Sequence, residues 1–441
     1  MSSATSRTAL VASLVAIGTA IYTTGPLYRV RTWWSFDDPL AADWFVIGVQ
    51  VAVAAVALAA VVRFGRWRRL DRTTVIVAGA LVGWLALGSL WSASPSTTLR
   101  ESLLVGVALL AGVGAAAAAG DRLLAVSAWI GVHLGLGWSA ILIVLVRPGT
   151  QFESQWTGVY FNPNSLALVS AFGILLAIVL VAMIATRRIE LASPWRVGVM
   201  VVVSASVPAD LWLISGTGAL TPLFGLGVAL GVAVIAIAAQ RSIGAASAHP
   251  IDGRLVAGVA GLAVVAIGAV TWLTRERWSS AVGRTGGFSR RTDMWEVALD
   301  WFSRAPIVGQ GYLGAWSDPE FTAEMLAARG TVLGSTHNSF VELLLGAGLV
   351  GFGLAVALYA LLWLAAGTRA LADRRITSVW PLAVLVYVIV EHLGETLFVG
   401  GQLMVATTGA LIVVSRPPSS PPTAPTPPPT GVESVVGERR S

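Results

Sequence analysis

The sequence predicts an all-α fold, a polytopic bundle of transmembrane helices, on three observations. Only 12% of the 441 residues are charged, against about 25% in soluble globular proteins. Apolar residues make up 56% of the chain, and the mean hydropathy is +0.77. Twelve apolar runs approach or exceed the roughly 20 residues that a helix needs to cross a bilayer. Together with the absence of Cys, this excludes a cytoplasmic enzyme, a disordered chain, a nucleic-acid-binding module and a disulfide-stapled secreted domain.

Short loops connect the twelve predicted spans, with one exception, residues 274–336. The spans lie at residues 8–24, 44–62, 73–91, 102–120, 123–146, 164–185, 195–214, 218–240, 255–273, 338–364, 378–396 and 397–415. The first is interpreted as a retained helix, because no small-residue cleavage site follows it. The predicted organisation is therefore a membrane domain at 1–273, a loop domain at 274–336, and a second membrane domain at 337–416. A Pro-rich tail at 417–441 is expected to be disordered.

The basic residues predict how the bundle is oriented. Every cation is Arg, and fourteen of them fall in one alternate set of short loops, whereas the other set holds four. Because Arg accumulates in cytoplasmic loops, the first set is predicted to be cytoplasmic, with both chain termini inside. The long loop at 274–336 is then extracytoplasmic. An even number of spans agrees with both termini on one side.

Two helices are predicted within the long loop. Residues 292–305 place Trp295, Ala298, Leu299 and Phe302 on one face, the spacing of an amphipathic helix. Pro306 ends it. A second helix is predicted from an Asp318 N-cap, with Pro319 in its first turn, to Gly330. The loop is therefore expected to form a folded, helical cap on the outer face.

The four His residues differ as candidate catalytic groups. His249 is interpreted as having no role, and His133 as packing against a neighbouring helix. His392 lies between Glu391 and Glu395 near a predicted helix end, and intramembrane ionisable groups are functional candidates. His337 stands where the long loop re-enters the membrane. Its neighbours Thr336 and Asn338 also fit a plain helix cap.

The surroundings of His337 resemble the signature of a known membrane family. His337-Asn338, then nine residues, Gly348, two residues and Gly351 is similar to the H-[N/S/Q]-x9-G-x-x-G pattern of the O-antigen ligase/polymerase group. Three further segments agree in order: Trp91-Ser-Ala-Ser-Pro95, Gly158-Val-Tyr-Phe-Asn-Pro-Asn164, and Arg291-Thr-Asp-Met-Trp295 followed by Pro306, Gly309 and Gly311. The resemblance runs from about Trp91 to Gly353.

The resemblance implies a GT-C-like bundle of about twelve helices with one large outer loop. It also implies an enzyme of the bacterial plasma membrane. Such an enzyme moves a glycan from a polyprenyl-diphosphate carrier to a hydroxyl group of a glycan, lipid or protein acceptor, as a ligase or a polymerase. No cofactor is expected, and transfer is expected to be metal-independent, since no acidic cluster with metal spacing occurs on the outer side. ATP use is not expected, because no phosphate-binding loop motif is present.

Candidate residues follow from the charges in that reaction. Arg is suited to bind the leaving diphosphate, because its planar guanidinium donates two parallel hydrogen bonds to phosphate oxygens. His337 and Arg291 are the predicted catalytic residues. Arg291 is predicted to contact either the diphosphate or a structural carboxylate such as Asp293 or Asp300. His337 could be a base for the acceptor hydroxyl or, as imidazolium, a phosphate ligand. The predicted substrate-binding residues are Arg290, Arg284, Arg147, Asn162, Asn164 and Asn338.

One segment departs from the family pattern and leaves alternatives open. Relatives carry an S-R-G-A-like element near the seventh and eighth spans, where this chain reads Ser215-Gly-Thr-Gly-Ala-Leu220 without Arg. Three explanations of the missing Arg are open. The chain uses another cation, it uses a different glycan donor, or it is a non-catalytic assembly partner. Asp210, just before it, is left unexplained by the motifs, and Arg147 and an Arg of the long loop are its candidate partners. A secondary transporter or lipid-glycan flippase is the alternative from another functional class.

Overall fold

The protein is described by a computed structural model over nine stretches of the chain. These are residues 44–64, 70–145, 151–152, 155–160, 162–245, 291–330, 334–373, 375–396 and 403–415. The predicted spans at 8–24 and 255–273 lie outside them. So do His249, the tail at 417–441, and the candidate residues Arg147, Arg284 and Arg290.

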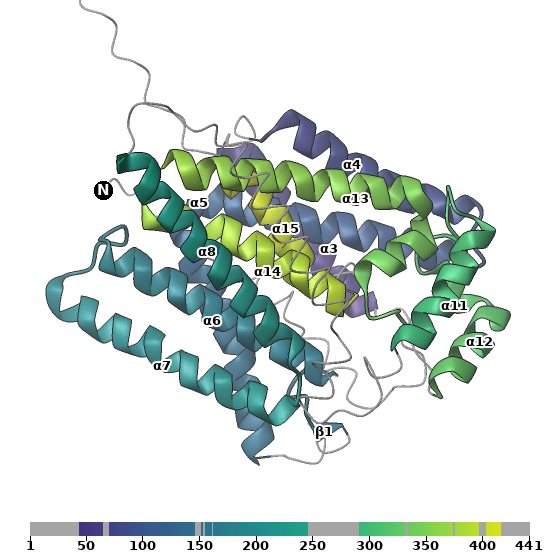
Figure 1. The fold of residues 1–441 in the computed structure, drawn as a ribbon, viewed down its shortest axis with the longest axis horizontal. Coiled ribbons are helices and arrows are strands. Elements are labelled where there is room, and N and C mark those ends of the chain that lie inside the picture. The colour runs from purple at the N-terminus through teal and green to yellow at the C-terminus, as the bar shows by residue number, and fades with distance from the viewer. Residues whose placement is uncertain are drawn as a thin grey trace, which may run out of the picture.

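The described chain is almost entirely helical, and Figure 1 shows its long helices side by side as a bundle. The N-terminal half contains α3 (Trp44–Phe64), α4 (Arg72–Leu87), η2 (Gly88–Leu90), α5 (Pro95–Leu145), β1 (Gln151–Phe152), β2 (Gln155–Trp156), α6 (Pro163–Ala185), α7 (Ser193–Thr217) and α8 (Thr221–Ala245). The C-terminal half contains α11 (Arg291–Arg304), η3 (Gly314–Ser317), α12 (Pro319–Arg329), α13 (Ser339–Ala372), η4 (Ile376–Ser378), α14 (Trp380–Gly394) and α15 (Leu403–Val414). Strands β1 and β2 pair antiparallel in a small hairpin.

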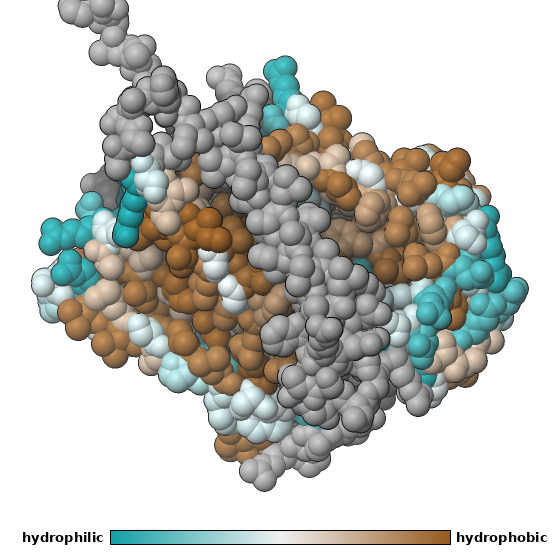
Figure 2. Space-filling model, viewed as in Figure 1, coloured by the Kyte–Doolittle hydropathy of each residue, from teal (hydrophilic) through white to brown (hydrophobic). Residues whose placement is uncertain are grey.

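The composition of these helices is that of a membrane protein. Seven helices within the described residues are long and apolar enough to cross a bilayer, and α15 is a shorter apolar helix. Figure 2 shows hydrophobic residues over the body of the bundle and hydrophilic residues gathered at its two ends. Apolar residues on α7 and α8, among them Val202 and Val234, are more than half exposed. Lipid is the environment that such a surface requires. The predicted all-α membrane fold is confirmed; the count of twelve spans and the GT-C-like arrangement stay predictions.

Helix α5 covers two of the predicted spans. Its 51 residues would extend about 75 Å, far more than the roughly 30 Å hydrocarbon core of a bilayer. The helical geometry breaks at Gly120, where φ is +67° and ψ is 173°, a conformation that glycine adopts readily. The two halves therefore correspond to the spans predicted at 102–120 and 123–146. The first half begins earlier than predicted, at Pro95.

The two loop helices are found where the sequence predicts them. Helix α11 ends at Arg304, just before Pro306. Helix α12 has the Asp318 carboxylate as its N-cap, and ends at Gly330 with a left-handed φ of +80°. Figure 1 shows α11 and α12 together at one end of the molecule. They form a cap beside the N-terminal end of α13.

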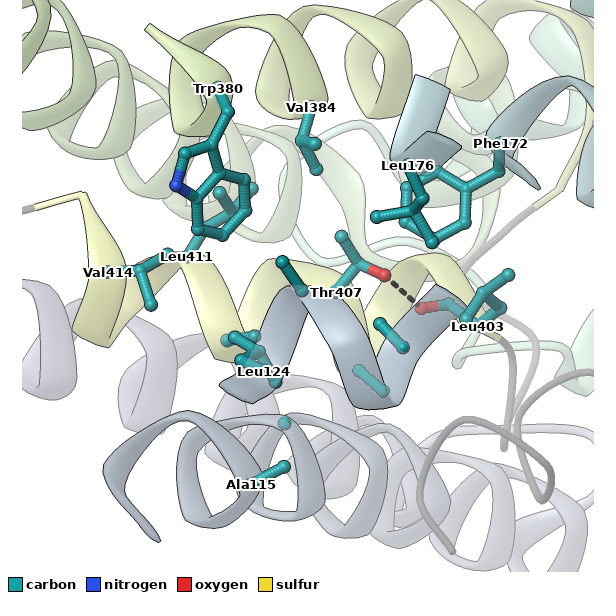
Figure 3. Close-up of a pocket in the computed structure, with 15 residues that line it drawn as sticks. Ala115, Leu124, Phe172, Leu176, Trp380, Val384, Leu403, Thr407, Leu411 and Val414 are labelled. Carbon is teal, nitrogen blue, oxygen red and sulfur yellow. Dashed lines mark hydrogen bonds between the residues drawn. The ribbon is translucent and has the colours of Figure 1, made fainter. Parts of the chain in front are cut away.

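An apolar cavity of about 60 Å³ lies within the bundle, between α5, α6, α14 and α15. Figure 3 shows Phe172, Trp380 and Leu411 among the side chains around it. The hydroxyl of Thr407 donates to the Leu403 carbonyl oxygen of its own helix, at 2.8 Å. This cavity is too small and too apolar to hold a sugar. Hydrophilic residues are gathered instead at the ends of the bundle (Figure 2).

Candidate functional site

Four segments meet at the end of the bundle that carries α11 and α12, and they meet on the carboxylate of Glu395. This residue directly follows α14. Its Oε1 accepts hydrogen bonds from Asn164 Nδ2 at 2.8 Å and from Arg291 Nη2 at 3.1 Å. Its Oε2 lies 2.9 Å from His337 Nδ1. We call these four residues the Glu395 cluster.

Each member of the cluster is placed by the end of a helix. Asn164 lies in the first turn of α6, whose N-cap is Asn162. Arg291 begins α11, and His337 lies just before the Asn338 N-cap of α13. Three of the four members belong to separate motifs of the sequence resemblance. The fold thus brings together segments that lie up to 231 residues apart in the chain.

The carboxylate of Glu395 is held in its charged form. Burial acts to raise the pKa of Glu395, but the charge and hydrogen bond of His337, followed by those of Arg291, outweigh burial, so the pKa is lowered from 4.5. Glu395 is therefore ionised at neutral pH. An ionised carboxylate can only accept a hydrogen bond.

This geometry determines how His337 presents its ring. Because Glu395 accepts, Nδ1 of His337 carries the proton of their hydrogen bond. In the neutral imidazole, Nε2 is then left as an acceptor. Nε2 has no hydrogen-bond partner among the described residues, and 17% of the side chain is exposed. The ring can therefore take a proton from a molecule that reaches this end of the bundle.

The backbone of His337 is left-handed. Its φ is +52°, a value that few residues other than Gly adopt, although Asn, Asp and His adopt it more often than the rest. The neighbours hold it in place: Thr336 N donates to Glu342 Oε2 at 2.8 Å, and Asn338 Oδ1 accepts from Phe340 N at 2.9 Å. A conformation of this kind persists where the surroundings fix the backbone, and it is concentrated at functional sites.

Further hydrogen bonds, made by buried residues of α13 and α14, hold the backbone of Glu395. Ser339 Oγ donates to the Glu395 carbonyl oxygen at 2.9 Å and lies 2.7 Å from His392 Nδ1. The other ring nitrogen of His392 contacts the hydroxyl of Tyr359. His392 is fully buried, so substrate cannot reach it directly. Its contacts indicate that it positions the chain around Glu395.

Glycines of the sequence motifs have a structural function beside the cluster. Helix α13 breaks at Gly348, where φ is +64°. The N–H groups after the break have no partner within the helix. Leu349 N donates instead to the Pro306 carbonyl oxygen at 2.8 Å, and Gln310 N donates to the Leu345 carbonyl oxygen at 2.8 Å. A Cβ on Gly309 would lie 2.5 Å from Ala347 N. The loop therefore docks into the break in α13.

The Trp-Ser-x-x-Pro motif is part of the same docking arrangement. Trp91 Nε1 donates to the Gly309 carbonyl oxygen at 3.0 Å, and Trp84 Nε1 to the Ala347 carbonyl oxygen at 2.8 Å. A Cβ on Gly311 would lie 2.4 Å from the Ser92 side chain. These motif residues fix the loop domain on the bundle. These contacts also fix the part of α13 before Gly348, which follows His337 in the chain.

Two further predicted site residues within the described part of the chain, Asn162 and Asn338, make contacts within the protein. Asn162 Oδ1 accepts from Asn164 N at 2.8 Å. Asn338 caps α13 through Oδ1, and its Nδ2 donates to the Leu393 carbonyl oxygen at 3.2 Å. Both therefore hold the backbone, and their predicted sugar contacts stay predictions. Arg291 is paired with Glu395, not with the predicted Asp293 or Asp300; Asp300 pairs with Arg304.

Within the described residues, the buried carboxylate of Asp210 contacts a histidine. Asp210 Oδ2 lies 3.0 Å from His133 Nε2, a contact between α7 and α5. The other nitrogen of His133 contacts the Trp129 carbonyl oxygen at 2.8 Å. His133 does pack against another helix, as predicted, and its ring also pairs with a buried acid.

The segment without the family's Arg forms the end of α7. Gly218 is its left-handed C-cap, with φ +64°. Thr217 Oγ1 donates to the Ile214 carbonyl oxygen at 2.7 Å. A Cβ on Gly216 would lie 2.0 Å from the Trp156 ring. Sequence reasoning named Glu395 only as one of the two acids beside His392. Its role as the centre of the cluster depends on contacts across the chain that no local spacing encodes.

Stability should depend on pH through Glu395. The pKa of Glu395 is lowered on folding, so its stabilising contribution is fully present above the unfolded value near 4.5 and is lost as pH falls through the lower folded value. Glu395→Gln should reduce the free energy of unfolding at pH 7 by about 3 kcal/mol, because it leaves His337 and Arg291 without their counter-charge. The measurement is unfolding of the purified protein from pH 7 to pH 3.

Exposed Glu296 in α11 offers a matched control. Glu296→Gln should leave the pH dependence of the wild type unchanged, whereas in Glu395→Gln the deficit should shrink as the solution is acidified. A deficit of constant size from pH 7 to pH 3 would contradict a charged Glu395.

Residues 209–356 match the family model described as O-antigen ligase. This stretch covers the end of α7, all of α8, the loop domain and the first part of α13. It contains Arg291 and His337, whereas Asn164 and Glu395 lie outside it. No curated protein matches the chain. The matched residues include the His337 and Arg291 motifs, and the fold is an all-α membrane bundle, so over residues 209–356 this chain is similar to the O-antigen ligase family.

Proposed function

We propose that the protein transfers a glycan from a polyprenyl-diphosphate carrier to an acceptor hydroxyl, at the outer face of the bacterial plasma membrane. Members of the family are ligases and polymerases of lipid-linked glycans. The observation that carries the proposal is the Glu395 cluster: a His with one free ring nitrogen, a buried carboxylate and an Arg, assembled at one end of a membrane bundle.

In the proposed reaction the acceptor hydroxyl gives its proton to Nε2 of His337. Its oxygen forms a bond to the anomeric carbon of the sugar. The bond between that carbon and the phosphate oxygen breaks, and the diphosphate leaves with the electron pair. His337 is suited to be the base, because Glu395 fixes its tautomer and stabilises the imidazolium that forms. Glu395 itself is a positioning residue.

The leaving diphosphate requires cations. Arg291 is bound by Glu395 and by the Gly394 carbonyl oxygen, which uses only part of the donor set of a guanidinium. The remaining N–H groups are available to phosphate oxygens. Arg147, Arg284 and Arg290 are proposed to supply further positive charge, in place of the Arg that is missing before Gly218. Asn162, Asn164 and Asn338 are proposed to border the sugar.

The proposal is tested by the glycans that accumulate on the carrier. Strains with the gene deleted, or carrying Arg291→Gln, should accumulate polyprenyl-linked glycan several-fold over the parent, measured by mass spectrometry of extracted lipids. Long chains on the carrier would identify a ligase, and single repeat units a polymerase. Arg304→Gln is the matched control, because Arg304 is exposed, and its ion pairs and its contact with the Trp301 ring lie at the surface away from the Glu395 cluster.

Two results would contradict the proposal. Unchanged carrier-linked glycans in the deletion strain would exclude glycan transfer as the activity. Accumulation in the Arg304→Gln strain equal to that in Arg291→Gln would show that charge on the loop domain, rather than the Glu395 cluster, is what matters.

A further inference from the structure

A cavity of about 420 Å³ lies at the end of the bundle opposite the Glu395 cluster, lined almost entirely by cationic and hydroxyl side chains. Figure 1 shows the turn between α6 and α7 at the far end from α11 and α12. The lining residues are Arg122, Thr186, Arg187, Arg188, Arg375, Ile376 and Thr377. They come from the break in α5, the α6–α7 turn and the segment before α14.

The arginines of this cavity have few counter-charges. Within the described part of the chain, no carboxylate pairs with Arg122, Arg187 or Arg188. Two acids lie nearby. Asp121 pairs with Arg369, outside the cavity, and Asp373 lies 3.7 Å from Arg375, the fourth arginine of the lining. The cavity therefore has an excess of positive charge.

Arg188 is the most deeply placed of the four. Its Nη1 donates to Thr377 Oγ1 at 2.9 Å, which fixes the guanidinium between two loops. Its Nε is buried and has no hydrogen-bond partner. Burial lowers the pKa of Arg188, against the opposing charges of Asp121 and Asp373. A donor left unsatisfied in this way is the position that an anionic oxygen would fill.

Arg187 provides a second, independent observation. It follows the C-cap of α6 with φ +56°, the position at which helices usually place Gly. Arg188 N and Ile189 N donate back to the Met183 carbonyl oxygen at 2.8 and 3.2 Å, so the turn is fully formed. An Arg at a glycine position is costly for the backbone. Its side chain lines the cavity.

We propose that this cavity binds a phosphate group, supplied by an anionic lipid headgroup or by phosphate in solution. Three membrane-spanning segments end beside it: α6 at Ala185, the α14 segment at Ile376, and the first half of α5 near Gly120. That is the level at which headgroups lie. Arg and Thr side chains provide the donors that phosphate oxygens accept. The proposal is independent of the proposed glycan transfer.

The test measures binding of phosphatidylglycerol to the purified full-length protein by native mass spectrometry, with phosphatidylcholine as the neutral lipid. Arg187→Gly is the sharpest variant, because it removes the side chain and relieves the backbone. It should weaken phosphatidylglycerol binding about tenfold, the effect of losing one charged hydrogen bond, while thermal stability is unchanged or higher. Arg122→Gln, which removes a guanidinium without a hydrogen-bond partner among the described residues, should weaken binding similarly.

Exposed Arg241 in α8, at the same end, provides a control with the same loss of charge. Arg241→Gln should bind phosphatidylglycerol as the wild type does. Inorganic phosphate that displaces the lipid would show that the phosphate group alone is recognised, and failure to displace it would identify the lipid headgroup as the ligand. Equal weakening by Arg241→Gln, or full binding by both Arg187→Gly and Arg122→Gln, would overturn the proposal.

Discussion

Replacing His337 with Asn should lower glycan transfer by about 10²–10⁴-fold, the usual contribution of a general base. Asn is the preferred replacement because His337 has a left-handed φ of +52°, which Asn tolerates better than Ala. The backbone before α13 is then kept while the imidazole is removed. The measurement is turnover of a polyprenyl-diphosphate-linked oligosaccharide by protein reconstituted in liposomes.

The pH dependence of transfer distinguishes a base from a phosphate ligand. With His337 as base, the rate of the wild type should rise with pH through one ionisation, and that ionisation should be absent from His337→Asn. Glu395→Gln should slow transfer but keep the dependence on His337, because the carboxylate that orients the imidazole is gone. A lower rate that still depends on His337 is the signature of a positioning residue.

Fold integrity is checked by thermal unfolding of the same samples, in which His337→Asn should match the wild type. A His337→Asn variant that turns over normally would show that the residue serves only the entry into α13. A variant that binds the donor weakly but keeps the pH profile of the wild type would assign His337 to phosphate binding instead.

The cap helices could be predicted from sequence because their signals are local. Pro306 lies just beyond the end of α11, and Asp318, Pro319 and Gly330 mark both ends of α12. The membrane helices were predicted less accurately where polar residues belong to them. Helix α13 continues eight residues past the predicted end at 364, to Ala372, and carries the buried Arg369. Hydropathy falls at such a residue although the helix continues.

Arg369 shows why that boundary was missed. Its guanidinium contacts Asp121 and the Val414 carbonyl oxygen, two groups far away in the chain. A buried charge with partners of this kind is tolerated inside a bundle. In the sequence, the same residue is indistinguishable from a cytoplasmic loop Arg. The start of α5 was missed for a similar reason, because Glu101 is polar yet buried.

Most residues of the candidate site could be predicted from the sequence, but the hydrogen bonds that join them could not. His337, Arg291 and Asn164 were identified through motifs, and the structure joins them through one acid, Glu395. That acid belongs to none of those motifs. Its partners lie 58, 104 and 231 residues away. Spacing along one helix cannot predict such a contact, and hydrogen-bond geometry in three dimensions is required.

The contact between α5 and α15 should be the most sensitive packing interface of the bundle. Each helix presents a glycine to the backbone of the other. A Cβ on Gly112 would lie 1.8 Å from the Ala406 carbonyl oxygen, and one on Gly409 would lie 2.1 Å from the Leu109 carbonyl oxygen. Small residues permit this approach in membranes, where close packing rather than the hydrophobic effect drives helix association.

Gly112→Ala should therefore lower the free energy of unfolding by at least about 3 kcal/mol, the upper part of the range for overpacked cores, because the clash is with backbone that cannot rotate away. Gly137, in the same helix, has open space around its Cα, so Gly137→Ala should leave stability unchanged or raise it by about 0.5–1 kcal/mol through helix propensity alone. Unfolding of both variants by titration with dodecyl sulfate in mixed micelles measures the difference. The two variants should change the free energy of unfolding differently, because the methyl group of Gly112→Ala meets backbone and that of Gly137→Ala meets lipid. Equal stabilities of the two variants would mean that α5 and α15 are not in backbone contact.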